Sequence, residues 1–158
     1  MLLAMRVPFF RYADMFEMFA DEYRQAMDSV LSRGAYILQA ENNEFDLAFA
    51  KYIGVAHSVG VGNGTDAIML ALRAAAVGPG DEVIMPSHTY IATAASVHFV
   101  GATPVLVECG SDHLIDPEAV AAAIGPRTRC IMPVQLNGQG SPPRSARWPQ
   151  SRCTCGRA

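Results

Sequence analysis

Short apolar runs alternate with longer helix-like stretches between residues 55 and 134, and this alternation is the strongest indication of the fold. The apolar runs are rich in β-branched residues, as strands covered on both faces usually are. The stretches between them have the length of the crossover helices in βαβ units. Because strands joined by such crossovers run parallel, the pattern predicts an α/β fold with a mostly parallel sheet and flanking helices.

The period of the apolar residues assigns the individual elements. We expect strands at 55–62, 82–86, 103–109 and 128–134, and helices at 65–76, 89–101 and 116–124. Upstream, apolar residues recur three and four positions apart, which predicts helices at 14–32 and 41–52. Gly34 and Gly54 follow these two helices, where a glycine commonly ends a helix.

The chain divides into three parts by its pattern. Residues 1–55 are predicted to form an N-terminal helical segment, and residues 56–138 part of an α/β domain. Residues 139–158 are rich in Pro, Ser and Arg and have no periodicity, so no further βα unit can be drawn there. Two explanations of this tail stay open, a disordered segment or a shifted reading frame, and codon usage after Asn137 distinguishes them.

Composition excludes several classes of function. The 158 residues are 51% hydrophobic with a formal net charge of −3, so no basic surface for nucleic acid is expected. No apolar run is long enough to span a membrane, and the opening MLLAMRVPFF lacks the features of a signal peptide. Cys109 and Cys130 stand alone in strand-like runs, where we expect reduced thiols. These features predict a cytoplasmic protein with no nucleic-acid or membrane partner.

A glycine-rich turn, VGVGNGTDAIML at residues 59–70, joins an expected strand to an expected helix. A helix that starts after such a turn offers free N–H groups and a positive dipole end, which suit an anion. Gly62 and Gly64 let the backbone approach a phosphate, while Thr65 adds a hydroxyl donor and can cap the helix. Asp66 lies in the first turn, where an acidic side chain is favoured.

A missing glycine and a missing lysine argue against two classes of phosphate ligand, dinucleotides and the nucleotides bound by Walker A loops. The dinucleotide fingerprint needs a glycine where Thr65 stands, and a Walker A loop needs a lysine that the turn lacks. A single phosphate, such as that of a monophosphate cofactor, is therefore predicted, and a tight turn without a ligand is the alternative.

A second polar group follows the next expected strand. Ser87, His88, Thr89 and Tyr90 fall at the carboxyl end of a parallel strand, where α/β folds bind ligands. Tyr90 can lay its ring on a heterocycle, and a position in the core is the alternative.

The segments GNGTDA (62–67) and PSHTYIAT (86–93) make the sequence resemble the DegT/StrS family of pyridoxal-phosphate-dependent aminotransferases. The resemblance covers residues 6–138. It implies the large domain of a fold type I enzyme and a homodimer with active sites at the interface. It also implies pyridoxal 5′-phosphate (PLP) as cofactor, and transfer of an amino group, commonly from glutamate, to a nucleotide-linked keto sugar.

The resemblance further implies roles for individual residues. Gly64, Thr65 and Asp66 match the cup that holds the cofactor phosphate, and Tyr90 matches the aromatic residue that stacks on the pyridine ring. Residues 36–38 resemble a segment near the substrate mouth. At the end of the last expected strand stand two more polar residues, either in a supporting role or without a ligand: Gln135 and Asn137.

Two catalytic residues of the family have no counterpart in this sequence. In the family, the acid that bonds the pyridine nitrogen and the Schiff-base lysine both lie further along than residue 158. The one lysine present, Lys51, stands in no matching motif. Since a transaminase needs both groups, we expect a truncated, inactive chain without a catalytic residue of its own.

Three functions stay open at this point. The first is a nucleotide-sugar aminotransferase cut short by a frameshift. The second is a non-catalytic fragment that binds a phosphate or a partner chain and has a regulatory role. The third is a dehydratase relative, in which another residue replaces the lysine. For the chain by itself, uncovered strand faces and a sheet edge predict poor solubility.

Overall fold

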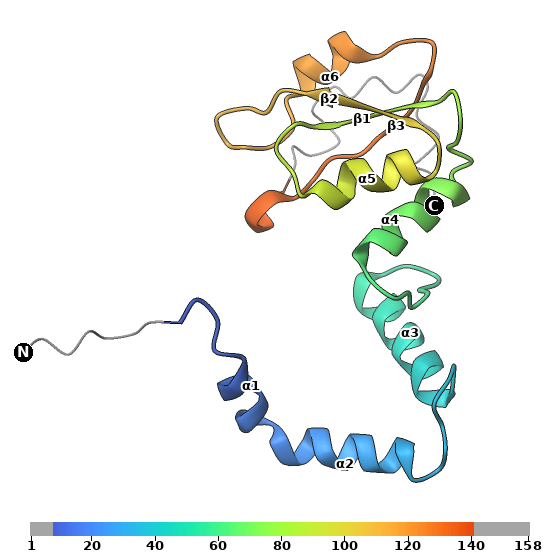
Figure 1. The fold of residues 1–158 in the computed structure, drawn as a ribbon, viewed down its shortest axis with the longest axis vertical. Coiled ribbons are helices and arrows are strands. Elements are labelled where there is room, and N and C mark those ends of the chain that lie inside the picture. Colours follow the sequence, from blue (N-terminus) through green and yellow to red (C-terminus); the bar gives the residue numbers. More distant parts are fainter. Residues whose placement is uncertain (1–7, 141–158) are drawn as a thin grey trace, which may run out of the picture. The chain divides into compact units, whose positions relative to one another are not determined.

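The computed structural model describes residues 8–140 of the chain (Figure 1). Contacts gather the chain into two compact units, divided in the sequence between Gly60 and Val61. The expected boundaries at residues 55 and 138 stay predictions. Of the expected tail, residues 141–158 lie outside the described part of the chain.

The first unit contains three helices among residues 8–60, namely α1 (Tyr12–Met18), α2 (Ala20–Leu31) and α3 (Ala40–Ile53). Helix α3 confirms the helix expected at 41–52, and Gly54 ends it in the left-handed region at φ 79°. The single helix expected at 14–32 is wrong, because the backbone leaves the helical range at Phe19, with φ −128° and ψ 21°. The rings of Phe16 and Tyr23 stack across this break, with centroids 6.0 Å apart.

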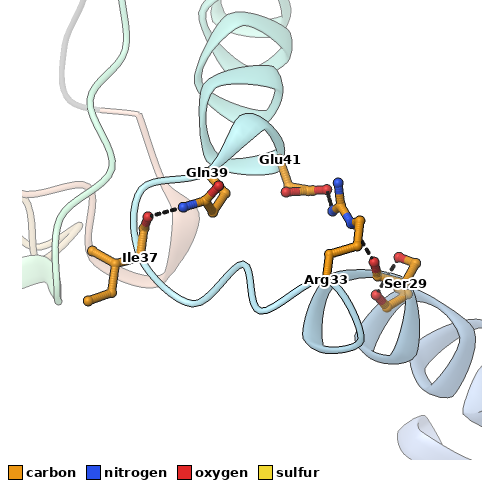
Figure 2. Close-up of polar contacts among 6 residues, drawn as sticks. Ser29, Arg33, Ile37, Gln39 and Glu41 are labelled. Atoms are coloured by element: carbon orange, nitrogen blue, oxygen red, sulfur yellow. Dashed lines mark hydrogen bonds and ion pairs between the residues drawn. The ribbon is translucent and has the colours of Figure 1, made fainter.

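A polar cluster joins the end of α2 to the start of α3 (Figure 2). Arg33 donates from Nε to the carbonyl oxygen of Ser29 at 2.7 Å and forms an ion pair with Glu41. Within the connection, Gln39 donates from Nε2 to the carbonyl oxygen of Ile37 at 2.8 Å. A backbone hydrogen bond at Glu41 and then the Arg33 guanidinium hold the pKa of the Glu41 carboxyl below its usual range.

The second unit begins at Val61 and is built of alternating helices and strands. Its elements are α4 (Gly64–Ala74), β1 (Glu82–Pro86), α5 (Ile91–Phe99), β2 (Thr103–Val107), α6 (Pro117–Ala123), β3 (Thr128–Ile131) and the short 3₁₀ helix η1 (Leu136–Gly138). The three strands form a parallel sheet in the order β2–β1–β3. The expected α/β fold, with a parallel sheet and flanking helices, is therefore confirmed.

Strand β1 lies at the centre of the sheet and is buried on both faces. Its successive side chains enter two different cores, because a strand alternates its faces. Val83 and Met85 pack with apolar residues of α4 and α5, whereas Ile84 packs with Val120 of α6. Figure 1 shows α5 and α6 on opposite faces of the sheet. The double coverage expected from the apolar runs is thus present at β1.

The strand expected at 55–62 is wrong. These residues pair with no strand in the described part of the chain. A run of strand-like residues becomes a strand only where a neighbour exchanges backbone hydrogen bonds with it, and the described sheet consists of β2, β1 and β3 alone. The glycine turn therefore leads from an irregular segment into α4.

The three helices of the first unit keep their apolar side chains exposed. Helices α1 and α2 bury no residue, and α3 buries only Ala50. The exposed apolar side chains on these helices include Met15, Phe16, Tyr23, Phe45 and Phe49. Burying one such side chain stabilises a folded or associated state by about 1.5–3 kcal/mol. Exposed apolar surface on these helices therefore favours association.

We predict that the 158-residue chain self-associates at micromolar concentration through α1–α3. Phe45→Lys, which places a charge beside Phe49, its stacking partner at 5.7 Å, should shift the sedimentation distribution toward smaller species. Asn43→Lys on the same helix adds the same charge without removing apolar surface and should leave the distribution unchanged. A monodisperse parent chain that unfolds cooperatively as a monomer would contradict the prediction.

We predict that Arg33→Gln raises the pKa of Glu41 toward its ordinary value, because the substitution removes the neighbouring positive charge. NMR titration of the Glu41 carboxyl carbon measures this pKa. Arg24→Gln, which removes the exposed pair with Asp21 and the cation–π contact with Phe16 and leaves Glu41 untouched, is the control. Since the folded-state pKa lies below the unfolded value of about 4.3, the contact stabilises the fold at neutral pH. The stabilisation is lost as the pH falls through the folded-state pKa. An unchanged pKa in Arg33→Gln would assign the whole shift to the backbone hydrogen bond.

Candidate functional site

The glycine turn ends at Asn63, which caps α4. Asn63 Oδ1 accepts a hydrogen bond from the backbone N–H of Asp66 at 3.0 Å, and Asn63 Nδ2 donates to Asp66 Oδ2 at 2.9 Å. The two residues thus satisfy each other at the start of the helix. The cap expected at Thr65 is wrong, because the helix begins one residue earlier, at Gly64, and places Thr65 inside its first turn.

Three donors in the first turn of α4 have no hydrogen-bond partner within residues 8–140. They are the backbone N–H of Gly64, the backbone N–H of Thr65 and the Thr65 hydroxyl. A Cβ at Gly64 would meet no atom within 4 Å, so the turn is open beside that residue. Together with the positive end of a helix of 11 residues, these donors fit a phosphate group.

Asp66 lies in the same turn, but its backbone N–H and its Oδ2 are bonded to Asn63. A Cβ at Gly62 would come within 2.9 Å of Asp66 Oδ2, so a larger residue there would displace the carboxylate. The structure therefore gives Asp66 and Gly62 a part in shaping the turn. Direct phosphate binding by Asp66 stays a prediction.

Tyr90 is the N-cap residue of α5 and follows β1 at its carboxyl end. Its carbonyl oxygen accepts from the N–H of Thr93 at 3.0 Å, which fixes the backbone at this point. The side chain is 77% exposed, so the alternative of a core position is wrong. An exposed ring at the end of a central parallel strand is suited to contact a ligand, and stacking on the pyridine ring stays a prediction.

Two histidines meet at the same edge of the sheet. The rings of His88, after β1, and His113, in the loop after β2, lie edge to face with centroids 5.6 Å apart. His113 adopts φ 64°, in the left-handed region. Sequence reasoning missed the pair because the two residues lie far apart in the sequence. The available signal was that each follows one of two neighbouring parallel strands.

The other residues singled out from the sequence are placed as follows. Gln135 and Asn137 follow β3, and Asn137 lies within η1 at φ 54°. Residues 36–38 and Lys51 belong to the first compact unit, whereas Thr65 and Tyr90 belong to the second. The roles suggested for Gln135, Asn137 and residues 36–38 stay predictions.

Two further features of residues 8–140 concern metal ions and membranes. No three side chains of His, Cys, Asp or Glu there come close enough together to hold a metal ion. No helix in the same range has both the length and the apolar composition that crossing a membrane requires.

Comparison with known proteins agrees with the fold. The model of the DegT/DnrJ/EryC1/StrS aminotransferase family matches residues 18–145. The chain belongs to this family, and the resemblance found in its motifs is confirmed.

Individual relatives make the likeness more specific. The dTDP-3-amino-3,4,6-trideoxy-alpha-D-glucose transaminase of Streptomyces venezuelae is 48% identical over 134 residues, 84% of this chain and 35% of that protein. The crystal structure of S. venezuelae DesV in complex with a ketimine intermediate matches with a TM-score of 0.84 and 47% identity, over 86% of this chain and 37% of that one. The structure of NtdA from Bacillus subtilis with bound cofactor PMP matches with a TM-score of 0.83 and 31% identity, over 86% of this chain and 32% of that one. The chain thus spans about a third of the length of these relatives.

Proposed function

We propose that this chain supplies the phosphate cup and the ring platform of a PLP-dependent aminotransferase that acts on a nucleotide-linked keto sugar. Membership of the aminotransferase family supports the reaction class. The similarity to a dTDP-sugar transaminase supports the substrate class, with an amino acid such as glutamate as amino donor. The observation that carries the cofactor assignment is the set of three donors at the start of α4 that have no partner within the described residues 8–140.

Each part of the turn has a task in this proposal. The N–H groups of Gly64 and Thr65 and the Thr65 hydroxyl bind the phosphate, and the helix dipole favours its negative charge. Hydrogen bonds to a charged phosphate are stronger than those between neutral groups, so a few donors hold the cofactor firmly. The hydrogen bonds between Asn63 and Asp66 fix the backbone of the turn and so hold these donors in place.

Tyr90 has the second task, since its exposed ring lies against the pyridine ring of the bound cofactor. When bound, PLP supplies the electron sink for transfer of the amino group. The protein's share, in these 158 residues, is to bind the cofactor and to orient it.

We also propose that these 158 residues do not turn over by themselves. The only lysine is Lys51, which lies in α3 of the first compact unit and in no motif of the family. Without an amine to link the cofactor covalently, the chain holds it by hydrogen bonds and stacking alone. The motifs of the family that can be matched in residues 1–158 include neither the catalytic lysine nor the acid at the pyridine nitrogen.

A homodimer is the proposed assembly. Helices α1 and α2 bury no residue, and a second copy would cover their exposed aromatic and aliphatic side chains. Apolar surface of this kind is typical of the core of an obligate interface.

We predict that Thr65→Val weakens binding of pyridoxamine 5′-phosphate about tenfold, because the substitution removes one charge-assisted hydrogen bond to the phosphate. Equilibrium dialysis against the 158-residue chain measures the dissociation constant, and this ligand has no aldehyde to react with Lys51. Thr103→Val removes an exposed hydroxyl at the start of β2 and serves as the matched control. A parent chain that binds neither this ligand nor inorganic phosphate at millimolar concentration would refute the phosphate cup.

We predict no amino transfer by the 158-residue chain supplied with PLP, glutamate and a nucleotide-linked 3-keto or 4-keto sugar. Formation of 2-oxoglutarate measures the transfer, and the rate with free PLP alone is the baseline. Sustained turnover above that baseline would show that a residue within the chain replaces the family's lysine. Lys51→Arg would then tell whether Lys51 is that residue.

A further inference from the structure

Ser96 connects the two halves of the candidate site through a buried hydrogen bond. It lies in α5 and is 0% exposed. Its hydroxyl has one proton and faces two carbonyl oxygens, that of Ala92 at 2.7 Å, one turn back in the same helix, and that of Thr65 in α4 at 3.3 Å, so the proton is shared in a bifurcated hydrogen bond. The second contact joins residues 31 positions apart in the sequence, and both belong to the second compact unit.

The contact between Ser96 and Thr65 joins elements that carry two different residues of the candidate site. Thr65 is the residue whose N–H and hydroxyl are unpartnered donors in the first turn of α4. The helix that carries Ser96 begins directly after Tyr90, whose backbone is held by Thr93. Ser96 therefore links two parts of the candidate site. From α5, which begins directly after Tyr90, it contacts the first turn of α4, which carries the donors.

A hydroxyl at this position is not needed to satisfy the backbone of either helix. Alanine is smaller by one atom, and the bond to Ala92 is the local kind that serine makes inside many helices. The Thr65 carbonyl, inside an α-helix, also accepts the N–H four residues further on, so removing Ser96 Oγ leaves it satisfied. What a change to alanine removes is the link between α4 and α5.

We propose that Ser96 is a positioning residue that fixes the separation between the phosphate donors of α4 and the ring of Tyr90. The proposal rests on the proposed cofactor site and deepens it. A ligand that spans both parts, with a phosphate at one end and an aromatic ring at the other, depends on this separation. Inorganic phosphate contacts the donors alone and does not depend on it.

The test compares two ligands and two readouts on the 158-residue chain. Equilibrium dialysis gives the dissociation constants of pyridoxamine 5′-phosphate and of inorganic phosphate, and hydrogen exchange by mass spectrometry reports on the amides of 62–69. Ser96→Ala removes the hydroxyl, and Ser96→Cys keeps a weaker donor of similar size. Thr128→Val is the control. Thr128 is the first residue of β3, and its part-buried hydroxyl accepts a hydrogen bond from the N–H of Gly125.

In Ser96→Ala we expect pyridoxamine 5′-phosphate to bind about fivefold more weakly, as loss of one modest hydrogen bond implies, and phosphate to bind within twofold of the parent. We also expect faster exchange at 62–69, intermediate effects in Ser96→Cys and none in Thr128→Val. Unchanged binding of pyridoxamine 5′-phosphate, or an equal loss for both ligands, would overturn the positioning role.

A parent chain that binds neither ligand would overturn the proposed cofactor site. In that case the exchange at 62–69 decides on Ser96 by itself. Exchange as slow in Ser96→Ala as in the parent chain refutes the link between the helices, and faster exchange in this variant alone supports it.

Discussion

Val83, Ile84 and Met85 of β1 are buried between two cores, and both cores exist because helices cover each face of the sheet. Strands covered in this way run parallel and are joined by crossovers, so their carboxyl ends meet at one edge. The residues that follow β1 and β2, among them Tyr90 and His113, therefore gather at that edge. The place of the candidate site is a consequence of how β1 is buried.

At the glycine turn, the hydrogen bonds of Asp66 with Asn63 have two effects. Asp66 would repel an anion if its carboxylate faced the open donors. It is instead bonded to Asn63, which completes the cap and leaves Gly64 and Thr65 with unpartnered groups. The turn is thus stable without a ligand and still offers donors to one.

The sequence predicted most of this architecture because the signals are local. Apolar period located α3, α5, α6 and the three paired strands, and the motif around Gly64 located the turn. The errors have non-local causes. Nothing in the period marks the break at Phe19, and the segment 55–62 has strand-like residues but pairs with no strand within residues 8–140.

Contacts between distant residues were equally invisible to sequence reasoning. The meeting of His88 with His113, and that of Ser96 with Thr65, depend on how neighbouring elements pack. The cap at Asn63 was missed for a smaller reason, a shift of the helix start by one residue, which is the usual uncertainty at a helix end.

Because α1 and α2 bury no residue, the order of synthesis matters for this chain. These helices leave the ribosome first, and at roughly 5–20 residues per second the strands of the sheet follow only several seconds later. During that interval the nascent chain displays aromatic side chains such as Phe16 and Tyr23, which cover each other in part and are each 44% exposed in the described chain. Helices α1 and α2 therefore expose apolar side chains before the sheet can form.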